Sequence, residues 1–133
     1  MVTLGLVVAR FNRSVTEGME QSAREAATER GVEIAETIRV PGAYDSPLAA
    51  DRLARREGID AVAVIGAVVS GDTEHDRVIA DAAARGLTRV SVERDTPVTF
   101  GVSGPGMSGA EARERIEKGA EAIEAAIDLA EEL

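Results

Sequence analysis

The 133-residue sequence contains no cysteine, no tryptophan and a single histidine. The lack of cysteine excludes a disulfide scaffold, a thiolate metal site and a cysteine nucleophile. One histidine excludes a multi-histidine zinc site within the chain, and we therefore expect no metal site. Apolar runs are too short to cross a bilayer and the N-terminus lacks the layout of a signal peptide, so we expect a cytoplasmic protein that does not bind membranes.

Basic residues are scarce as well. Lysine and arginine total 15 against 24 aspartates and glutamates, which gives a net charge of −9, and Lys118 is the only lysine. Such a surface repels DNA, so we expect no nucleic-acid partner. Lys118 forms a small basic cluster with Arg113 and Arg115, which among acidic neighbours is typical of surface ion pairs. The acidic surplus and the near absence of lysine indicate a protein adapted to concentrated salt.

The hydrophobic pattern alternates between apolar runs and amphipathic segments along a single domain, residues 1–133. Continuous apolar runs are typical of strands covered on both faces, and the alternation predicts an α/β fold with a parallel sheet between helical layers. The expected strands are 4–9, 33–40, 61–69 and 97–102. The expected helices run over 14–31, 46–58, from 72 or 73 to at least 85, and from 108 to the C-terminus. Residues 87–94 fit either a strand or a continued helix.

Capping patterns mark several helix ends. Ser14 with Glu17, and Ser108 with Glu111, have the spacing of a capping box, in which two side chains satisfy free N–H groups of the first turn. Gly31 follows the first helical pattern and predicts its stop, because glycine adopts the left-handed conformation that ends many helices.

The few aromatic side chains and the only histidine lie at strand ends. Phe11 follows the first expected strand, Tyr44 the second and His75 the third, and Phe100 lies near the end of the fourth. In a parallel sheet with right-handed crossovers these ends meet at one edge, where ligands bind in open α/β folds. The sequence therefore predicts a site at that edge. The alternative is that each ring closes the top of the core.

The segment Gly66–His75 joins the third strand to the following helix through a glycine turn. Free N–H groups and the positive end of the helix dipole make such a start an anion site, although Asp72 within it favours a capping role. His75 lies in the first turn, where a neutral imidazole beside a phosphate suits proton transfer. The alternative for His75 is an exposed side chain without a role.

Residues 40–47 form a turn that contains proline and glycine after the second strand. Gly42 permits close approach of the backbone, and Asp45 can accept hydrogen bonds from ligand hydroxyls. The alternative is a simple helix entry, with Asp45 or Ser46 as its cap.

Five segments together resemble the lumazine synthase family in its short, archaeal-like form. The resemblance covers nearly the whole chain and rests on Arg10–Asn12, Val40–Pro47, Gly66–His75, Pro97–Val102 and Lys118–Ala122. Each segment alone is modest evidence for the family, but five segments in the right order and with matching spacing are strong evidence.

The resemblance implies a flavodoxin-like three-layer sandwich, with a four-stranded parallel sheet and helices on both faces. It also implies pentamers, which in some members assemble further into a shell, with active sites between neighbouring subunits. The helix that begins near His75 is then expected to continue to Arg94. The implied reaction condenses 5-amino-6-(D-ribitylamino)uracil with 3,4-dihydroxy-2-butanone 4-phosphate, without metal or organic cofactor. Its products are 6,7-dimethyl-8-ribityllumazine, phosphate and water.

The resemblance also assigns roles by position. The pyrimidine and ribityl chain would contact Phe11, Ala43, Tyr44, Asp45, Ala67, Val68 and Val69, and Phe100 would close the ring pocket from the adjacent subunit. The phosphate would contact Gly71, Asp72, Thr73, Arg115 and Lys118, and His75 would donate and accept protons.

Two departures and two alternatives accompany the resemblance. Asp45 stands where glutamate is usual, which shortens the reach to ribityl hydroxyls, and Ser70 stands where many members have arginine. Either Arg115 or Lys118 could be the main phosphate ligand. The alternatives are an archaeal-type riboflavin synthase, which dismutates lumazine, and a non-catalytic relative that binds flavin or forms a shell.

Overall fold

A computed structural model describes residues 1–71 and 75–133 of the chain. The strands are β1 (Thr3–Ala9), β2 (Glu33–Val40), β3 (Ala61–Val69) and β4 (Val98–Met107). The helices are α1 (Arg13–Glu29), α2 (Ser46–Ala54), α3 (His75–Arg94), α4 (Gly109–Arg113) and α5 (Lys118–Glu132), with a 3-10 turn, η1 (Ala43–Asp45), before α2.

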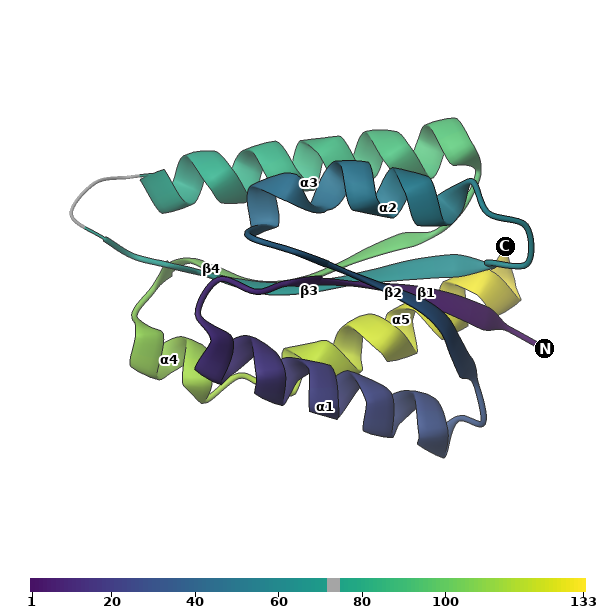
Figure 1. The fold of residues 1–133 in the computed structure, drawn as a ribbon, viewed down its shortest axis with the longest axis horizontal. Helices are drawn as coiled ribbons and strands as arrows, with labels where there is room; N and C mark the ends of the chain where they lie inside the picture. Colours follow the sequence, from purple (N-terminus) through teal and green to yellow (C-terminus); the bar gives the residue numbers. More distant parts are fainter. Residues whose placement is uncertain (72–74) are drawn as a thin grey trace.

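The four strands form one parallel sheet in the order β2-β1-β3-β4. Figure 1 shows α2 and α3 over one face of this sheet and α1, α4 and α5 over the other. The predicted three-layer α/β sandwich is therefore confirmed. Because all strands run the same way, their carboxyl ends share one edge, which lies at the left of Figure 1 beside the start of α3.

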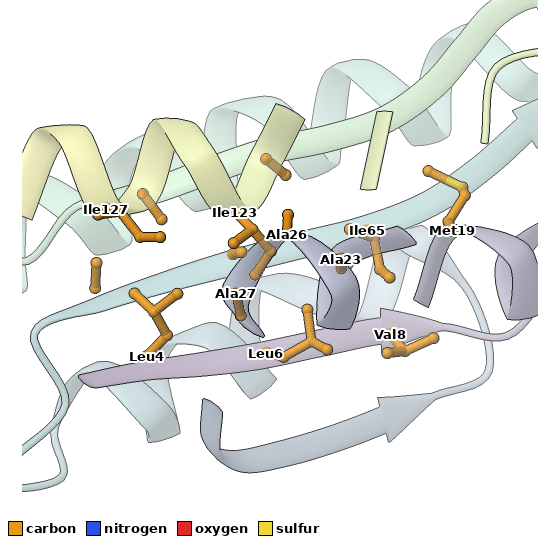
Figure 2. Packing of buried hydrophobic residues seen from close by; sticks show 14 of the residues in the cluster. Leu4, Leu6, Val8, Met19, Ala23, Ala26, Ala27, Ile65, Ile123 and Ile127 are labelled. Atoms are coloured by element: carbon orange, nitrogen blue, oxygen red, sulfur yellow. The ribbon is translucent and has the colours of Figure 1, made fainter. Parts of the chain in front are cut away.

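Burial follows the position of each strand in the sheet. Eight of the nine residues of the central strand β3 are buried, whereas all eight residues of β2, at the sheet edge, are partly or fully exposed. On the α1/α5 face, β1 contributes the larger side chains of Leu4, Leu6 and Val8, whereas β3 contributes three alanines and Ile65. Figure 2 shows Leu4, Leu6 and Ile65 packed against Met19 and Ile123 in this layer.

The opposite face has a separate, smaller core. Val7, Val62 and Val64 point from the sheet towards α2 and α3, where they meet Leu53 and Leu87. Residues of opposite parity along β1 and β3 thus fill the two layers, as the two-residue repeat of a strand requires.

The helix ends confirm some predictions and correct others. Ser108 caps α4 as predicted, since its Oγ accepts the N–H of Glu111 at 3.1 Å and the Glu111 carboxylate accepts the N–H of Ser108 at 3.2 Å. Gly31 follows α1 in the left-handed conformation, with φ +66°, and marks the end of this helix as predicted. The capping box predicted at Ser14 is wrong, because α1 begins one residue earlier and its N-cap is Asn12, in the left-handed conformation.

Around α2 the predicted boundaries were also shifted. The helix begins at Ser46 with Asp45 as N-cap, so Ser46 is the first helical residue rather than the cap. It ends at Ala54, four residues before Gly58, which lies in the following turn with φ +86°.

The strand predicted over 97–102 is too short, because β4 continues to Met107. The sequence Ser-Gly-Pro-Gly indicates a turn, yet the strand continues past it: Ser103 pairs with Ala67 and Met107 with Val69, while residues 104–106 lie in the irregularity between these pairs. The pairing is irregular between Ala67 and Val69, and Gly104 adopts φ +97°. Tertiary pairing therefore overrides the local turn preference.

The single helix predicted from Ser108 to the C-terminus is in fact two, α4 and α5, joined by a turn. The break places Ile116 beside Gly18 of α1 and Gly119 against the carbonyl oxygen of Met19, with no room for a Cβ at Gly119. By contrast, α3 extends without a break to Arg94, so the expectation that residues 87–94 continue the helix is confirmed.

Candidate active site

A pocket of about 610 Å³ lies at the carboxyl edge of the sheet, between η1, the ends of β1 and β3, and the first turn of α3. Residues from segments far apart in the sequence meet there. Nine of the predicted site residues line it: Phe11, Ala43, Tyr44, Asp45, Ala67, Val68, Val69, Gly71 and His75. The volume falls within the range of small-molecule sites.

The two aromatic rings of the pocket are exposed rather than packed. Phe11 is 59% exposed and Tyr44 64% exposed. A ring that closed the top of the core would be buried, so the packing alternative does not hold for these two residues. Asn12, directly after Phe11, has φ +65°, which turns the chain sharply from β1 into α1 and leaves the Phe11 ring beside the pocket.

Asp45 takes part in the turn before α2 and also lines the pocket. Its carboxylate accepts the N–H of Gly42 at 3.1 Å, and the residue occupies the N-cap position of α2 without a side-chain hydrogen bond to that helix. Ser46 adds to the turn by donating its hydroxyl to the carbonyl oxygen of Ala43 at 2.7 Å. Asp45 nevertheless lines the pocket, so one of its oxygens fixes the turn while the side chain still faces ligand space.

His75 is the first residue of α3, and its exposed side chain lines the pocket. It stands at the positive end of a 20-residue helix, where developing negative charge is stabilised. Asp72 and Thr73, two of the predicted phosphate contacts, lie outside the described residues. Gly71, the third member of that loop in the prediction, lies at the pocket wall.

Asp76 lines the pocket but was not predicted as a site residue. It is buried, and its Oδ2 accepts the N–H of Gly106 at 3.0 Å. This N–H holds the pKa of the Asp76 carboxyl below its usual value, helped by N–H groups of the first helical turn and opposed by burial. An acidic residue in a first turn is common, so nothing in the sequence marked its contact with a residue 30 positions away.

Phe100 lies apart from this pocket. It is the third residue of β4 and pairs with Val64 in the middle of β3, so its predicted place near a strand end is wrong because β4 is longer than expected. Its ring lines a second groove, of about 800 Å³, together with Val78 and Pro105. The two hollows have no lining residue in common.

Arg115 and Lys118 also lie outside the pocket lining. Arg115 is exposed in the turn between α4 and α5, and Lys118 is the half-buried first residue of α5. Within the part of the chain that the structure describes, neither they nor Arg113 form an ion pair, contrary to the ion-pair expectation. Both cations are therefore available to an anionic partner.

Neither a metal centre nor a membrane span is found among the described residues. In residues 1–71 and 75–133, histidine and acidic side chains form no group of three that could hold an ion. Over the same ranges, every helix is too short or too polar to cross a bilayer.

The whole chain, residues 1–133, matches the family model described as 6,7-dimethyl-8-ribityllumazine synthase. The protein belongs to the lumazine synthase family. Relatives that carry this name include one from Halorubrum lacusprofundi, 74% identical over 133 residues that cover all of this chain and 99% of the relative. Another, from Halobacterium salinarum, is 72% identical over the full length of both chains.

More distant lumazine synthases match over a similar span. The protein of that name from Methanococcus aeolicus is 45% identical over 133 residues, which cover all of this chain and 98% of the relative. The family predicted from five short segments is therefore confirmed, and with it the prediction of an enzyme of riboflavin biosynthesis. The family match and the named relatives favour a lumazine synthase over a riboflavin synthase.

Proposed function

We propose that this protein condenses 5-amino-6-(D-ribitylamino)uracil with 3,4-dihydroxy-2-butanone 4-phosphate at the pocket beside β3 and α3. The products are 6,7-dimethyl-8-ribityllumazine, phosphate and water. The observation that carries this proposal is the meeting of Phe11, Tyr44 and His75 in one pocket at a helix start, in a chain of the lumazine synthase family. No cofactor is required, because the substrate amine is itself the nucleophile.

Binding of the pyrimidine is assigned to apolar and backbone groups. The exposed Phe11 ring offers a flat face for stacking, and Ala67, Val68 and Val69 present their backbone at the end of β3. Asp45, which also lines the pocket, is assigned hydrogen bonds from ribityl hydroxyls. Holding both reactants in this way makes the reaction effectively unimolecular, which lowers the entropic part of the activation barrier.

Chemistry at the pocket requires proton transfer and the departure of phosphate. The 5-amino group condenses with the butanone carbonyl carbon and releases one water. Loss of phosphate together with the proton on the adjacent carbon then leaves an enol, which tautomerises to a second carbonyl. The ribityl-bearing amine condenses with this carbonyl and releases a second water. His75 is assigned the proton transfers, since it is the only imidazole of the chain and lines the pocket. The phosphate is assigned to the start of α3, to Gly71, and to Asp72 and Thr73, which lie outside the described residues.

We further propose that the active site is completed by a neighbouring subunit of a homopentamer. The phosphate is expected to need a cation, yet Arg115 and Lys118 lie away from the pocket of their own chain, as does Phe100. An adjacent copy could supply all three. The outer face of α3 supports such an assembly because Val78 and Val92 are 63% and 76% exposed.

Subunit complementation tests this shared site. His75→Ala and Phe100→Ala homo-oligomers should each be impaired, whereas oligomers reassembled from a mixture should regain part of the activity through sites that combine one intact half from each chain. If each chain carried a complete site, mixing would give only the average of the two activities. The subunit count itself follows from native mass spectrometry.

The setting of the reaction is proposed as the cytoplasm. A phosphorylated substrate does not cross a membrane unaided, so the enzyme and its supply must share a compartment. The net charge of −9 further supports adaptation to high salt. Unfolding followed in dilute and in concentrated salt tests this, since a protein indifferent to salt would contradict it.

The proposed reaction is tested with both substrates and purified protein, by following lumazine fluorescence and released phosphate. Incubation with lumazine alone separates the alternatives, since a riboflavin synthase would produce riboflavin. A non-catalytic relative would bind flavin and release no phosphate.

A further inference from the structure

The last residues of β4 hold the backbone that lines the pocket. The N–H of Ser70 donates to the carbonyl oxygen of Met107 at 2.6 Å, which continues the pairing of the two strands past the end of β3. Gly104 approaches so closely that a Cβ there would collide with the carbonyl oxygen of Val68. The end of β3 is therefore fixed from one side by the segment Ser103–Met107.

One side chain joins this segment to the start of α3. Asp76 is only 8% exposed, and its Oδ2 accepts the N–H of Gly106 at 3.0 Å. It directly follows His75 in the first turn of the helix and lines the same pocket. A single carboxylate thus connects the helix start that carries the imidazole with the strand end that braces β3.

Asp76 is negatively charged, which is unexpected for a residue that lines a site proposed to bind phosphate. A carboxylate beside the proposed phosphate opposes anion binding, so its presence calls for another role. The hydrogen bond to Gly106 also lowers its pKa, which keeps the group ionised and accepting at neutral pH.

We propose that Asp76 is a positioning residue, which fixes the start of α3 against the end of β4 and so sets the distance between His75 and the backbone of 67–70. This inference rests on the proposed function, because that backbone and His75 would hold the two reactants. In this proposal Asp76 acts only as the hydrogen-bond acceptor for the N–H of Gly106 and makes no contact with substrate. An error of about 1 Å in such a framework can cost on the order of 100-fold in rate.

Two substitutions separate acceptor geometry from charge. Asp76→Asn keeps an oxygen acceptor for Gly106 and removes the charge, whereas Asp76→Ala removes both. We expect kcat of Asp76→Ala to fall by about 10-fold or more with KM for either substrate changed by less than about 3-fold, and Asp76→Asn to recover most of kcat. Asp128→Asn, an exposed aspartate of α5, is the matched control and should leave both constants unchanged.

Other kinetic outcomes overturn the proposal. If Asp76→Asn and Asp76→Ala lose kcat equally, the charge matters and the acceptor does not. If both lower the KM for the phosphorylated substrate and leave kcat intact, Asp76 only repels phosphate. If Asp76→Ala matches the wild type, the link to Gly106 positions nothing.

Hydrogen exchange tests the same link without relying on turnover. In Asp76→Ala, peptides that cover Gly106 and Ser70 should exchange at least about 10-fold faster, while peptides from β1 keep the wild-type rate. Unchanged exchange at Gly106 would overturn the proposal even if activity falls. If the wild-type protein makes no lumazine, the proposed function fails, but the exchange result still decides whether Asp76 holds the two segments together.

Discussion

The two helical layers that cover the sheet differ in how completely they bury their apolar side chains. Between α1 and α5 the packing is close, since Gly119 meets the carbonyl oxygen of Met19 without room for a Cβ and Ile123 is fully buried. On the other face, α3 buries one row of side chains against the sheet but leaves Val78 and Val92 exposed on its outer side.

This difference separates what one chain does alone from what it does with copies of itself. The α1/α5 layer satisfies its own packing, so it should determine the stability of the protomer. The α2/α3 layer carries His75 and an uncovered apolar face, so substitutions there should act mainly on catalysis and assembly. Substitutions in the two layers are therefore expected to affect different measurements.

The largest effect on stability is expected in the α1/α5 layer. Ile123→Ala should lower the free energy of unfolding by about 3 to 4 kcal/mol, because it leaves a cavity among fully buried side chains. Urea denaturation at fixed protomer concentration measures this. Leu129→Ala, on the same helix but partly exposed, is the control and should cost about 1 kcal/mol or less. Equal losses would mean that the layer is less tightly packed than described.

The next effect concerns catalysis at the start of α3. His75→Ala should lower kcat by about 100-fold, equivalent to about 2.7 kcal/mol of barrier, because water replaces a placed proton donor and acceptor while substrate positioning remains. The free energy of unfolding should stay within about 0.5 kcal/mol of wild type, since the side chain is exposed. Complete loss of turnover with intact substrate binding would show that proton transfer outweighs positioning.

A third substitution tests the outer face of α3 as a contact surface between copies. Val92→Asp places a charge on that face far along the helix from His75 and should shift the protein to smaller species in sedimentation velocity. Protomer unfolding should change by less than about 0.5 kcal/mol. Glu93→Gln, exposed on the next position, should leave assembly unchanged. An intact oligomer with Val92→Asp would show that this face is not an interface.

The smallest effect is expected from an ion pair in the α2/α3 layer. Asp51 of α2 accepts Nε of Arg94 at 2.7 Å, and this hydrogen bond lowers the pKa of the Asp51 carboxyl. A pKa below its value in the unfolded chain stabilises the fold above about pH 4, and this stabilisation is lost as the pH falls through the folded-state pKa.

Chemical denaturation at pH 7 and pH 3 measures this contribution. Asp51→Asn should be slightly less stable than wild type at pH 7, and the difference should shrink at pH 3. Asp128→Asn, at the more exposed pair with Arg30 across α1 and α5, should show a smaller change between the two pH values. A larger change for Asp128→Asn than for Asp51→Asn would show that acid sensitivity does not lie mainly in the α2/α3 layer.

Much of the architecture was predictable because it depends on local pattern. The apolar run of β3 is covered on both faces, and parallel strands brought Phe11, Tyr44 and His75 to one edge, as the alternation indicated. The same reasoning failed for β4, because Gly104 and its neighbours look like a turn in the sequence. The strand resumes beyond them because Met107 pairs with Val69 of β3, and no local pattern encodes this pairing.

The site was predictable to a similar extent. Residues that follow strands could be placed by topology alone, whereas the contact of Asp76 with Gly106 joins segments whose nearness depends on the irregular end of β4. The break between α4 and α5 was missed for a related reason. Ala/Glu-rich sequence favours one helix, and the turn is stabilised by contacts with α1.

Both ends of the chain lie at the edge of the sheet away from the pocket, at the right of Figure 1, where Met1 and Leu133 border the same hollow. A purification tag or a fused domain attached to either end would thus project from the side opposite the substrates. Immobilising the protein through such a handle should leave the entrance free for small molecules.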